Sequence, residues 1–170
     1  DYTWNWGGYR DCQAFTSVFS TPRISCCVSY SPKVVKKAFA DNLYLNVFPR
    51  KTGSVNGSDW ISNHAELSDA LKQCSKLRKQ FLPYFTDGTL IGNCILTEPA
   101  PNTHTTAYVM PAKVLMIVVN AAAKGNITFN CDLEPWLESE SGKYMAKAYN
   151  TDGKLIETMD IDSPLWKGST

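Results

Sequence analysis

The sequence has no long hydrophobic run and no excess of charge of either sign. Its longest apolar run, Val114 to Val119, is far shorter than the roughly 20 residues of a membrane-spanning helix. Seventeen lysines and arginines stand against sixteen aspartates and glutamates, a formal net charge of +1. This near-balance removes the main electrostatic argument for a nucleic-acid or membrane partner, so we expect neither. The first residues show no basic segment leading into an apolar one, and we expect no signal peptide.

Motifs of several common catalytic and metal sites are also missing. There is no CxxC pair, and His64 and His104 lie far from any cysteine pair, so the sequence predicts no zinc site. No GxSxG elbow is present, and Gly7-Gly8 alone is not a phosphate-binding loop. We therefore expect no metal and no cofactor.

Six cysteines are present, but their spacing resembles no disulfide framework. Cys26 and Cys27 are adjacent within an apolar segment, and Cys74 falls on the apolar face of a predicted helix. This pattern favours buried free cysteines that act as small hydrophobic residues, and it gives no support for secretion.

The composition is that of a folded protein, and the residue pattern divides it in two. Hydrophobic residues make up 44% of the 170 residues and charged residues 19%, which argues against disorder. Strand and helix patterns alternate up to about residue 88, and short strand patterns dominate afterwards. We expect a mixed α and β fold with strand-helix units (partial α/β) over residues 1–88 and an antiparallel β-sandwich-like domain over 89–170.

The first half contains two predicted strands separated by a short helix. Ile24 to Tyr30 and Leu43 to Phe48 are short, apolar and typical of buried strands. Ser31-Pro32 is a favourable helix start, with a capping serine followed by proline at the first helical position.

A longer amphipathic helix is predicted from about residue 64 to 82. Asn63 and Glu66 have the spacing of a capping box, and Pro83 with Asp87-Gly88 is expected to end the helix. The apolar face repeats at spacings of three and four, through Leu67, Leu71, Cys74, Leu77 and Phe81.

The second half reads as a series of short strands separated by turn signals. The Asp152-Gly153 pair between two alternating runs predicts a hairpin. The expected strands are Leu90 to Leu96, Thr105 to Val109, Val114 to Asn120, Asn126 to Cys131, Met145 to Tyr149 and Leu155 to Met159.

Aromatic and polar side chains gather near the N-terminus in a pattern suited to saccharide binding. Trp4, Trp6 and Tyr9 can stack on the apolar faces of sugar rings, while Arg10 and Asp11 can hydrogen-bond hydroxyl groups. The alternative is that these aromatic rings pack in the core.

A weaker group of candidates lies where predicted strands end or in the loops that follow. It comprises Tyr30, Arg50, Asp59 and Trp60. In a parallel βα architecture this edge of the sheet holds the active site. The alternative for this group is a solvated loop.

No pair of carboxylates suited to hydrolysis of a glycosidic bond is evident. Such a pair has to lie roughly 5 to 10 Å apart across the sugar, and neither predicted strand of the first half ends in an acid. Asp11 has no evident partner. The remaining candidates are expected to face solvent around turns of the second half: Glu134, Glu138, Glu140, Asp152, Glu157, Asp160 and Asp162.

Three stretches carry a resemblance to a known class of enzyme. They are AFADNLYLNVFPRK, then ELSDALKQCSKLRKQFLPYFTDGTLIG, then AYVMPAKVLMIVVN. From Val34 onward the chain resembles the C-terminal portion of a bacterial (β/α)8-barrel glycoside hydrolase, in which the end of the barrel is followed by a small β-sandwich. The resemblance implies a polysaccharide-degrading hydrolase whose catalytic acids lie on earlier barrel strands, so no catalytic residue is carried onto this chain.

The resemblance also implies an oligo- or polysaccharide partner and a secreted or periplasmic location. Two βα units cannot close a barrel, so we expect either self-association or the missing remainder of a larger chain. Two alternatives stay open: a free-standing carbohydrate-binding module, and a structural or interaction domain whose aromatic residues are all core.

Overall fold

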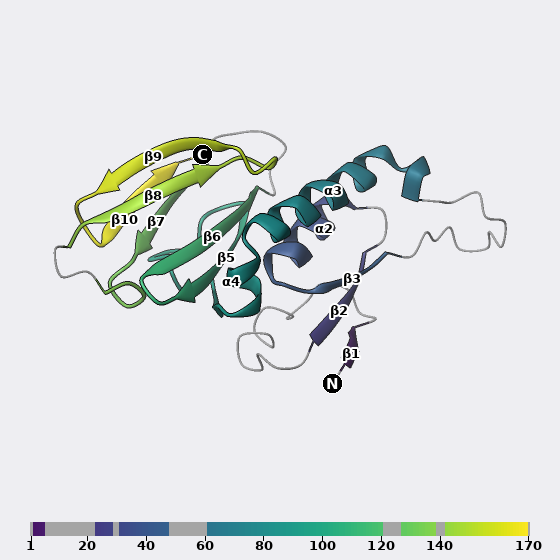
Figure 1. Cartoon of the computed structure of the whole chain (residues 1–170), viewed down its shortest axis with the longest axis horizontal. Coiled ribbons are helices and arrows are strands. Elements are labelled where there is room, and N and C mark those ends of the chain that lie inside the picture. Colours follow the sequence, from purple (N-terminus) through teal and green to yellow (C-terminus); the bar gives the residue numbers. More distant parts are fainter. Residues whose placement is uncertain are drawn as a thin grey trace.

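The chain folds into helices and small β-sheets, as a computed structural model shows (Figure 1). The structure describes residues 2–5, 23–28, 31–47, 61–120, 127–138 and 142–169. Its helical segments are α2 (Pro32–Ala40), η1 (Ile61–Asn63), α3 (Ala65–Gln80) and α4 (Leu82–Thr86). Its strands are β1 (Tyr2–Asn5), β2 (Arg23–Val28), β3 (Tyr44–Val47), β4 (Thr89–Gly92), β5 (Thr103–Met110), β6 (Lys113–Asn120), β7 (Thr128–Asp132), β8 (Tyr144–Tyr149), β9 (Leu155–Ile161) and β10 (Leu165–Ser169). The expected mixture of α and β structure is confirmed.

Three strands near the N-terminus form a parallel sheet in sequential order, β1-β2-β3. Trp4 lies opposite Ser25 between β1 and β2, and Val28 lies opposite Val47 between β2 and β3. The strands expected before and after the short helix are present as β2 and β3. The sequence pattern did not predict β1, because its four residues alternate among aromatic and polar types with no run of apolar residues.

The start of α2 agrees with the sequence, because Ser31 caps the helix and Pro32 occupies its first turn. The Ser31 Oγ accepts a hydrogen bond from the Val34 N–H at 3.4 Å, so one of the otherwise unpaired N–H groups of the first turn is satisfied.

The predicted capping box of the next helix is wrong. Asn63 belongs to η1, and the N-cap residue of α3 is His64, whose side chain makes no capping hydrogen bond. A short 3₁₀ turn at 61–63 displaces the helix start by one residue, which removes the spacing to Glu66. At the other end, α3 stops at Gln80, before Pro83, and Pro83 lies in the first turn of a second short helix, α4, where proline is well tolerated.

The rest of the chain is antiparallel. β4, β5 and β6 form one sheet, while β7 pairs with β10 and β8 pairs with β9. The hairpin expected at Asp152-Gly153 joins β8 to β9, and Gly153 takes a positive φ of 75° there. The strand expected over Leu90 to Leu96 is shorter than predicted: it ends at Gly92, which has a φ of 58°, and the chain turns.

β5 and β6 separate two clusters of buried side chains. On one face Tyr108 of β5 packs with the helices, in a cluster that includes Val35, Phe39, Leu67 and Phe85. On the other face, Ala107 of the same strand joins a cluster built from strands and turns, with Ile91, Ile95, Phe129, Cys131 and Leu133. Successive residues of a strand point to opposite faces, so β5 is buried on both sides.

The packing of the helices concerns the expected division of the chain into residues 1–88 and 89–170. α2, α3 and α4 pack on the strands that follow residue 88, so the two parts share a core (Figure 1). The boundary at residue 88 stays a prediction.

Three cysteines are described as free thiols, Cys74, Cys94 and Cys131. Burial was expected of all of them and is confirmed for Cys74 and Cys131, where it raises the pKa of each thiol to about 11. Cys94 is exposed, because it lies in the turn that follows β4, and for this residue the expectation was wrong.

None of the helices in the described ranges is long and apolar enough to cross a membrane.

Candidate functional site

The carboxyl ends of the three parallel strands define one edge of their sheet. β1 ends at Asn5, β2 at Val28 and β3 at Val47, and the parallel registers bring these ends to the same side. In open and closed parallel sheets alike, ligands bind beyond the carboxyl ends of the strands. This edge of the parallel sheet is therefore a candidate ligand-binding site.

The sequence candidates follow these strand ends in chain order. Trp6 comes directly after β1, Tyr30 comes two residues after β2, and Arg50 comes three residues after β3. Trp4 is part of β1 itself. Outside the described residues lie Trp6, Tyr9, Arg10, Asp11, Tyr30, Arg50, Asp59 and Trp60. Their placement relative to this edge therefore stays a prediction.

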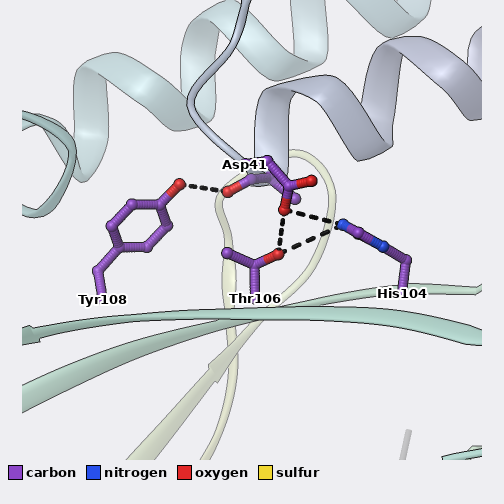
Figure 2. Close-up of polar contacts among 5 residues, drawn as sticks. Asp41, His104, Thr106 and Tyr108 are labelled. Atoms are coloured by element: carbon purple, nitrogen blue, oxygen red, sulfur yellow. Dashed lines mark hydrogen bonds and ion pairs between the residues drawn. The ribbon is translucent and has the colours of Figure 1, made fainter. Parts of the chain in front are cut away.

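A second feature is a buried polar cluster between α2 and β5, shown in Figure 2. Asp41 caps the C-terminus of α2 and is fully buried. Its Oδ1 lies 2.9 Å from His104 Nε2 and accepts a hydrogen bond of 2.5 Å from Thr106 Oγ1. A carboxylate only accepts hydrogen bonds, so the proton between Asp41 and His104 belongs on the imidazole nitrogen.

Tyr108, on the same face of β5, extends this cluster along the strand. Its hydroxyl donates a hydrogen bond to the carbonyl oxygen of Ala40, the last residue of α2 (Figure 2). Burial, together with the nearby charge of Asp41, raises the pKa of Tyr108 well above its ordinary value, so the hydroxyl stays protonated and keeps donating.

The neighbouring residue, Asn42, ties the same helix end to α3 and α4. It adopts a positive φ of 59°, a conformation in which asparagine is well tolerated. Its side-chain amide donates to the carbonyl oxygen of Phe85 at 2.9 Å and accepts from Arg78 Nη2 at 2.5 Å. The Arg78 guanidinium also lies 5.0 Å from the centre of the Phe85 ring, within the range of a cation–π contact.

The position of this cluster indicates a structural role. Asp41 and Asn42 connect the end of α2 to the start of β3, so they lie at the amino edge of the parallel sheet, opposite the strand ends considered above. Asp41 and Thr106 are each 0% exposed, which leaves no path for a substrate to reach them. The cluster satisfies buried polar groups where the helices meet the antiparallel sheet.

Sequence reasoning did not identify Asp41 and considered His104 only as a histidine far from any cysteine pair. The one local signal was the Asp41-Asn42 pair between a helix and a strand, which is typical of a turn. The partnership with His104 depends on residues more than sixty positions apart, and so it becomes visible only in the folded chain.

The acidic residues expected to face solvent around turns are exposed where they are described, although Glu157 and Asp160 lie within β9 and not at a turn. Glu134, Glu138, Asp152, Glu157, Asp160 and Asp162 are all exposed, while Glu140 lies outside the described residues. Within the described ranges no group of three or more histidine, cysteine or acidic side chains could hold a metal ion.

No family model, curated protein or solved structure matches this chain. Its function is therefore argued from its own residues and geometry.

Proposed function

We propose that this chain is part of a polysaccharide-degrading glycoside hydrolase and that it binds saccharide through aromatic residues at the carboxyl edge of its parallel strands. The observation that carries the proposal is the sequential parallel order β1-β2-β3. A (β/α)8 barrel places its strands side by side in chain order, with helices between them. α2 connects β2 to β3, and α2 packs beside α3, as neighbouring helices of a barrel do.

The antiparallel half supports the same proposal. Side chains of the β4-β5-β6 sheet and of the β7–β10 pair share one buried cluster, for example Ala107 with Phe129. Two antiparallel sheets that share a core are the basis of a sandwich, which is the element expected to follow the barrel.

The outer strands of the parallel sheet also fit a piece of a larger barrel. In the described part of the chain β1 and β3 each pair with only one strand, β2. Parallel strands need neighbours on both edges and cover on both faces. A longer chain would provide those neighbours, and it would also carry the catalytic acids.

The test is retention of the purified chain on a panel of insoluble and soluble polysaccharides. We expect retention of the unmodified chain and loss of retention in Trp6→Ala and Trp4→Ala. Tyr149→Ala is the matched control, because Tyr149 is a 37% exposed aromatic residue on β8, away from the parallel strands. Failure of the unmodified chain to bind any glycan, or equal loss with Tyr149→Ala, would contradict the proposal.

An interaction domain is the second candidate, and one observation favours it. Met145, Ile156 and Leu165 are each more than 60% exposed, at 63%, 63% and 64%, although they are large apolar residues. Large apolar side chains left on a protein surface are available for contact with a partner. Light scattering separates the readings: a stable oligomer without saccharide binding would favour the interaction domain.

A further inference from the structure

A small pocket lies beside the β7–β10 pair, on the far side of the molecule's core from the helices. Its volume is about 260 Å³, and loop residues 98–101 form one wall. Pockets for drug-sized ligands span roughly 300–1,000 Å³, so this one suits a smaller ligand of about one ring.

The pocket is held in shape by backbone contacts between its loop and β7. The Thr97 N–H donates to the carbonyl oxygen of Asn130 at 3.0 Å, and the Asp132 N–H donates to that of Ile95 at 2.9 Å. Leu96 forms an isolated bridge with Cys131 between these two contacts. Because the loop is fixed before a ligand arrives, little ordering entropy is lost on binding.

Close packing under the pocket depends on a glycine. Gly168 of β10 lies opposite Phe129 of β7, and a Cβ at position 168 would approach the Phe129 ring to 2.4 Å. The Phe129 ring occupies the space that a side chain at position 168 would need, on the buried face of β7 and opposite the face of Asn130 and Lys167.

Three polar side chains converge on the pocket. Lys167 lies directly opposite Asn130 in the β7–β10 pair, so both point to the same face. Asn130 Nδ2 donates to Glu98 Oε1 at 2.6 Å. This bond leaves the amide oxygen of Asn130, the second carboxylate oxygen of Glu98 and the ammonium of Lys167 without another side-chain partner in the described part of the chain.

The chemistry of these groups selects a class of ligand. One negative and one positive group side by side give no net preference for an anion or a cation. Donors and acceptors in close alternation match adjacent hydroxyl groups, each of which both donates and accepts. Pro99 and Pro101, both exposed in the loop wall, present apolar surface on which the C–H face of a sugar ring can pack.

We propose that this pocket binds one unit of a neutral saccharide, as a site separate from the carboxyl edge of the parallel strands. The choice of a saccharide draws on the proposed function, whereas the pocket and its polar groups do not. Glu98, Asn130 and Lys167 hydrogen-bond the hydroxyl groups, and the two prolines support the ring.

The experiment is an NMR titration of the isotope-labelled chain with maltose, cellobiose and xylobiose, followed through backbone amide shifts. We expect shifts in residues 97–102 and 128–130 with at least one of these disaccharides. Lys167→Ala and Glu98→Gln are each expected to weaken that binding about tenfold, the loss of one charge-assisted hydrogen bond. Lys147→Ala and Glu157→Gln are the matched controls, because both residues are exposed on the β8–β9 pair and neither lines the pocket.

The outcomes separate this proposal from the proposed function. Loss of binding in Lys167→Ala and Glu98→Gln, with binding at the pocket retained in Trp6→Ala, supports the pocket whatever happens at the parallel strands. Saccharide binding that Trp6→Ala abolishes, with no shifts in residues 97–102, overturns the pocket and leaves the proposed function in place. Absence of binding to every saccharide overturns both. Shifts in residues 97–102 with inorganic phosphate but not with saccharide also overturn the proposal of a saccharide pocket. Asn130→Ala is avoided as the primary variant because Asn130 is half-buried, whereas Lys167 and Glu98 are exposed, so we expect their replacement to leave the fold intact.

Discussion

Two antiparallel hairpins of this chain have similar geometry and opposite surroundings. β5–β6 is covered on both faces, by the helices on one side and by the second buried cluster on the other. In β8–β9, most side chains are at least partly exposed, and of β9 only Ile161 is buried. Both hairpins have an antiparallel ladder of hydrogen bonds, which a register shift between Ala148 and Tyr149 interrupts in β8–β9. We expect burial to make the larger difference to the stability of the two hairpins.

The comparison also explains why the apolar residues of the two hairpins differ in role. On β6, residues 114–118 form a continuous apolar run because alternate side chains enter different clusters. On β9, Leu155 and Ile156 are apolar neighbours that remain exposed, at 46% and 63%. Adjacent apolar residues in a strand are therefore covered on both faces in β6 but remain exposed in β9.

The largest expected effect on the free energy of unfolding comes from removing one tyrosine ring in each hairpin, β5–β6 and β8–β9. Tyr108→Ala in β5 is expected to lower the free energy of unfolding by about 3–5 kcal/mol, because the ring is 1% exposed and packs on Phe85 at 5.0 Å. Tyr149→Ala in β8 loses only a partly exposed edge contact with Phe81 at 5.1 Å, and we expect about 1 kcal/mol. Urea unfolding of both variants measures the difference, and equal losses would show that the two hairpins are equally buried in solution.

The next effect concerns the polar face of β5. Asp41→Ala is expected to cost about 2–4 kcal/mol, because it removes the buried carboxylate that accepts a hydrogen bond from Thr106 and lies 2.9 Å from His104 Nε2. Asp160→Ala, on the exposed part of β9, removes a carboxylate at the surface and should change stability by less than about 0.5 kcal/mol. Thermal unfolding of the two variants at one pH compares them, and a small loss in Asp41→Ala would argue against a structural role for the cluster.

A smaller effect is expected at alkaline pH, and it involves one thiol in each buried cluster. Burial raises the pKa of Cys74 and of Cys131 from 9.0 to about 11, so the unfolded chain releases these protons first. The contribution to stability is complete below pH 9 and is lost as pH rises toward 11.

Measuring the free energy of unfolding against pH checks this effect. In Cys74→Ala and Cys131→Ala the decline between pH 9 and pH 11 should be shallower than in the unmodified chain. An unchanged slope in both variants would show that these thiols do not titrate differently in the folded and unfolded states. Cys94, which is exposed, supplies the control substitution.

The smallest effect lies on the open face of the β8–β9 hairpin. Ile156→Thr keeps a β-branched side chain and should alter the free energy of unfolding by less than about 0.5 kcal/mol, since Ile156 is 63% exposed. Chemical denaturation measures it. A loss of more than 1 kcal/mol that depends on protein concentration would reveal that this face is covered by a second copy of the chain.

Much of the fold could be predicted because its signals are local. The serine cap and Pro32 marked the start of α2, the spacing of Leu67 and Cys74 marked the buried face of α3, and Asp152-Gly153 marked the β8–β9 turn. The sequence pattern did not predict the structure correctly where a strand was short or where a residue is compatible with two different structures. β1 and β10 contain few residues, and Pro83 can equally end a helix or occupy the first turn of the next one.

The candidate sites show the same limit. The aromatic residues near the N-terminus were visible in the sequence, and Trp4 lies in β1, the first strand of the parallel sheet. The pocket beside β7 was not visible, because Glu98, Asn130 and Lys167 are separated by about thirty residues from one to the next and meet only through the β7–β10 register. The acidic residues around turns were correctly expected to be exposed, since short polar segments between strands rarely find a buried partner.

The sequence by itself determined the types of the elements, most of their approximate bounds and the near-neutral charge, because these depend on residues close together in the chain. Apart from the β8–β9 hairpin, only the tertiary structure decided which strands pair. It also decided that β5 is buried on both faces and that Asp41 meets His104 and Thr106. The physical reason is that burial and hydrogen bonding between distant residues depend on loop closures that no local pattern encodes. The free energy of those contacts exists only once the helices and the sheet have come together.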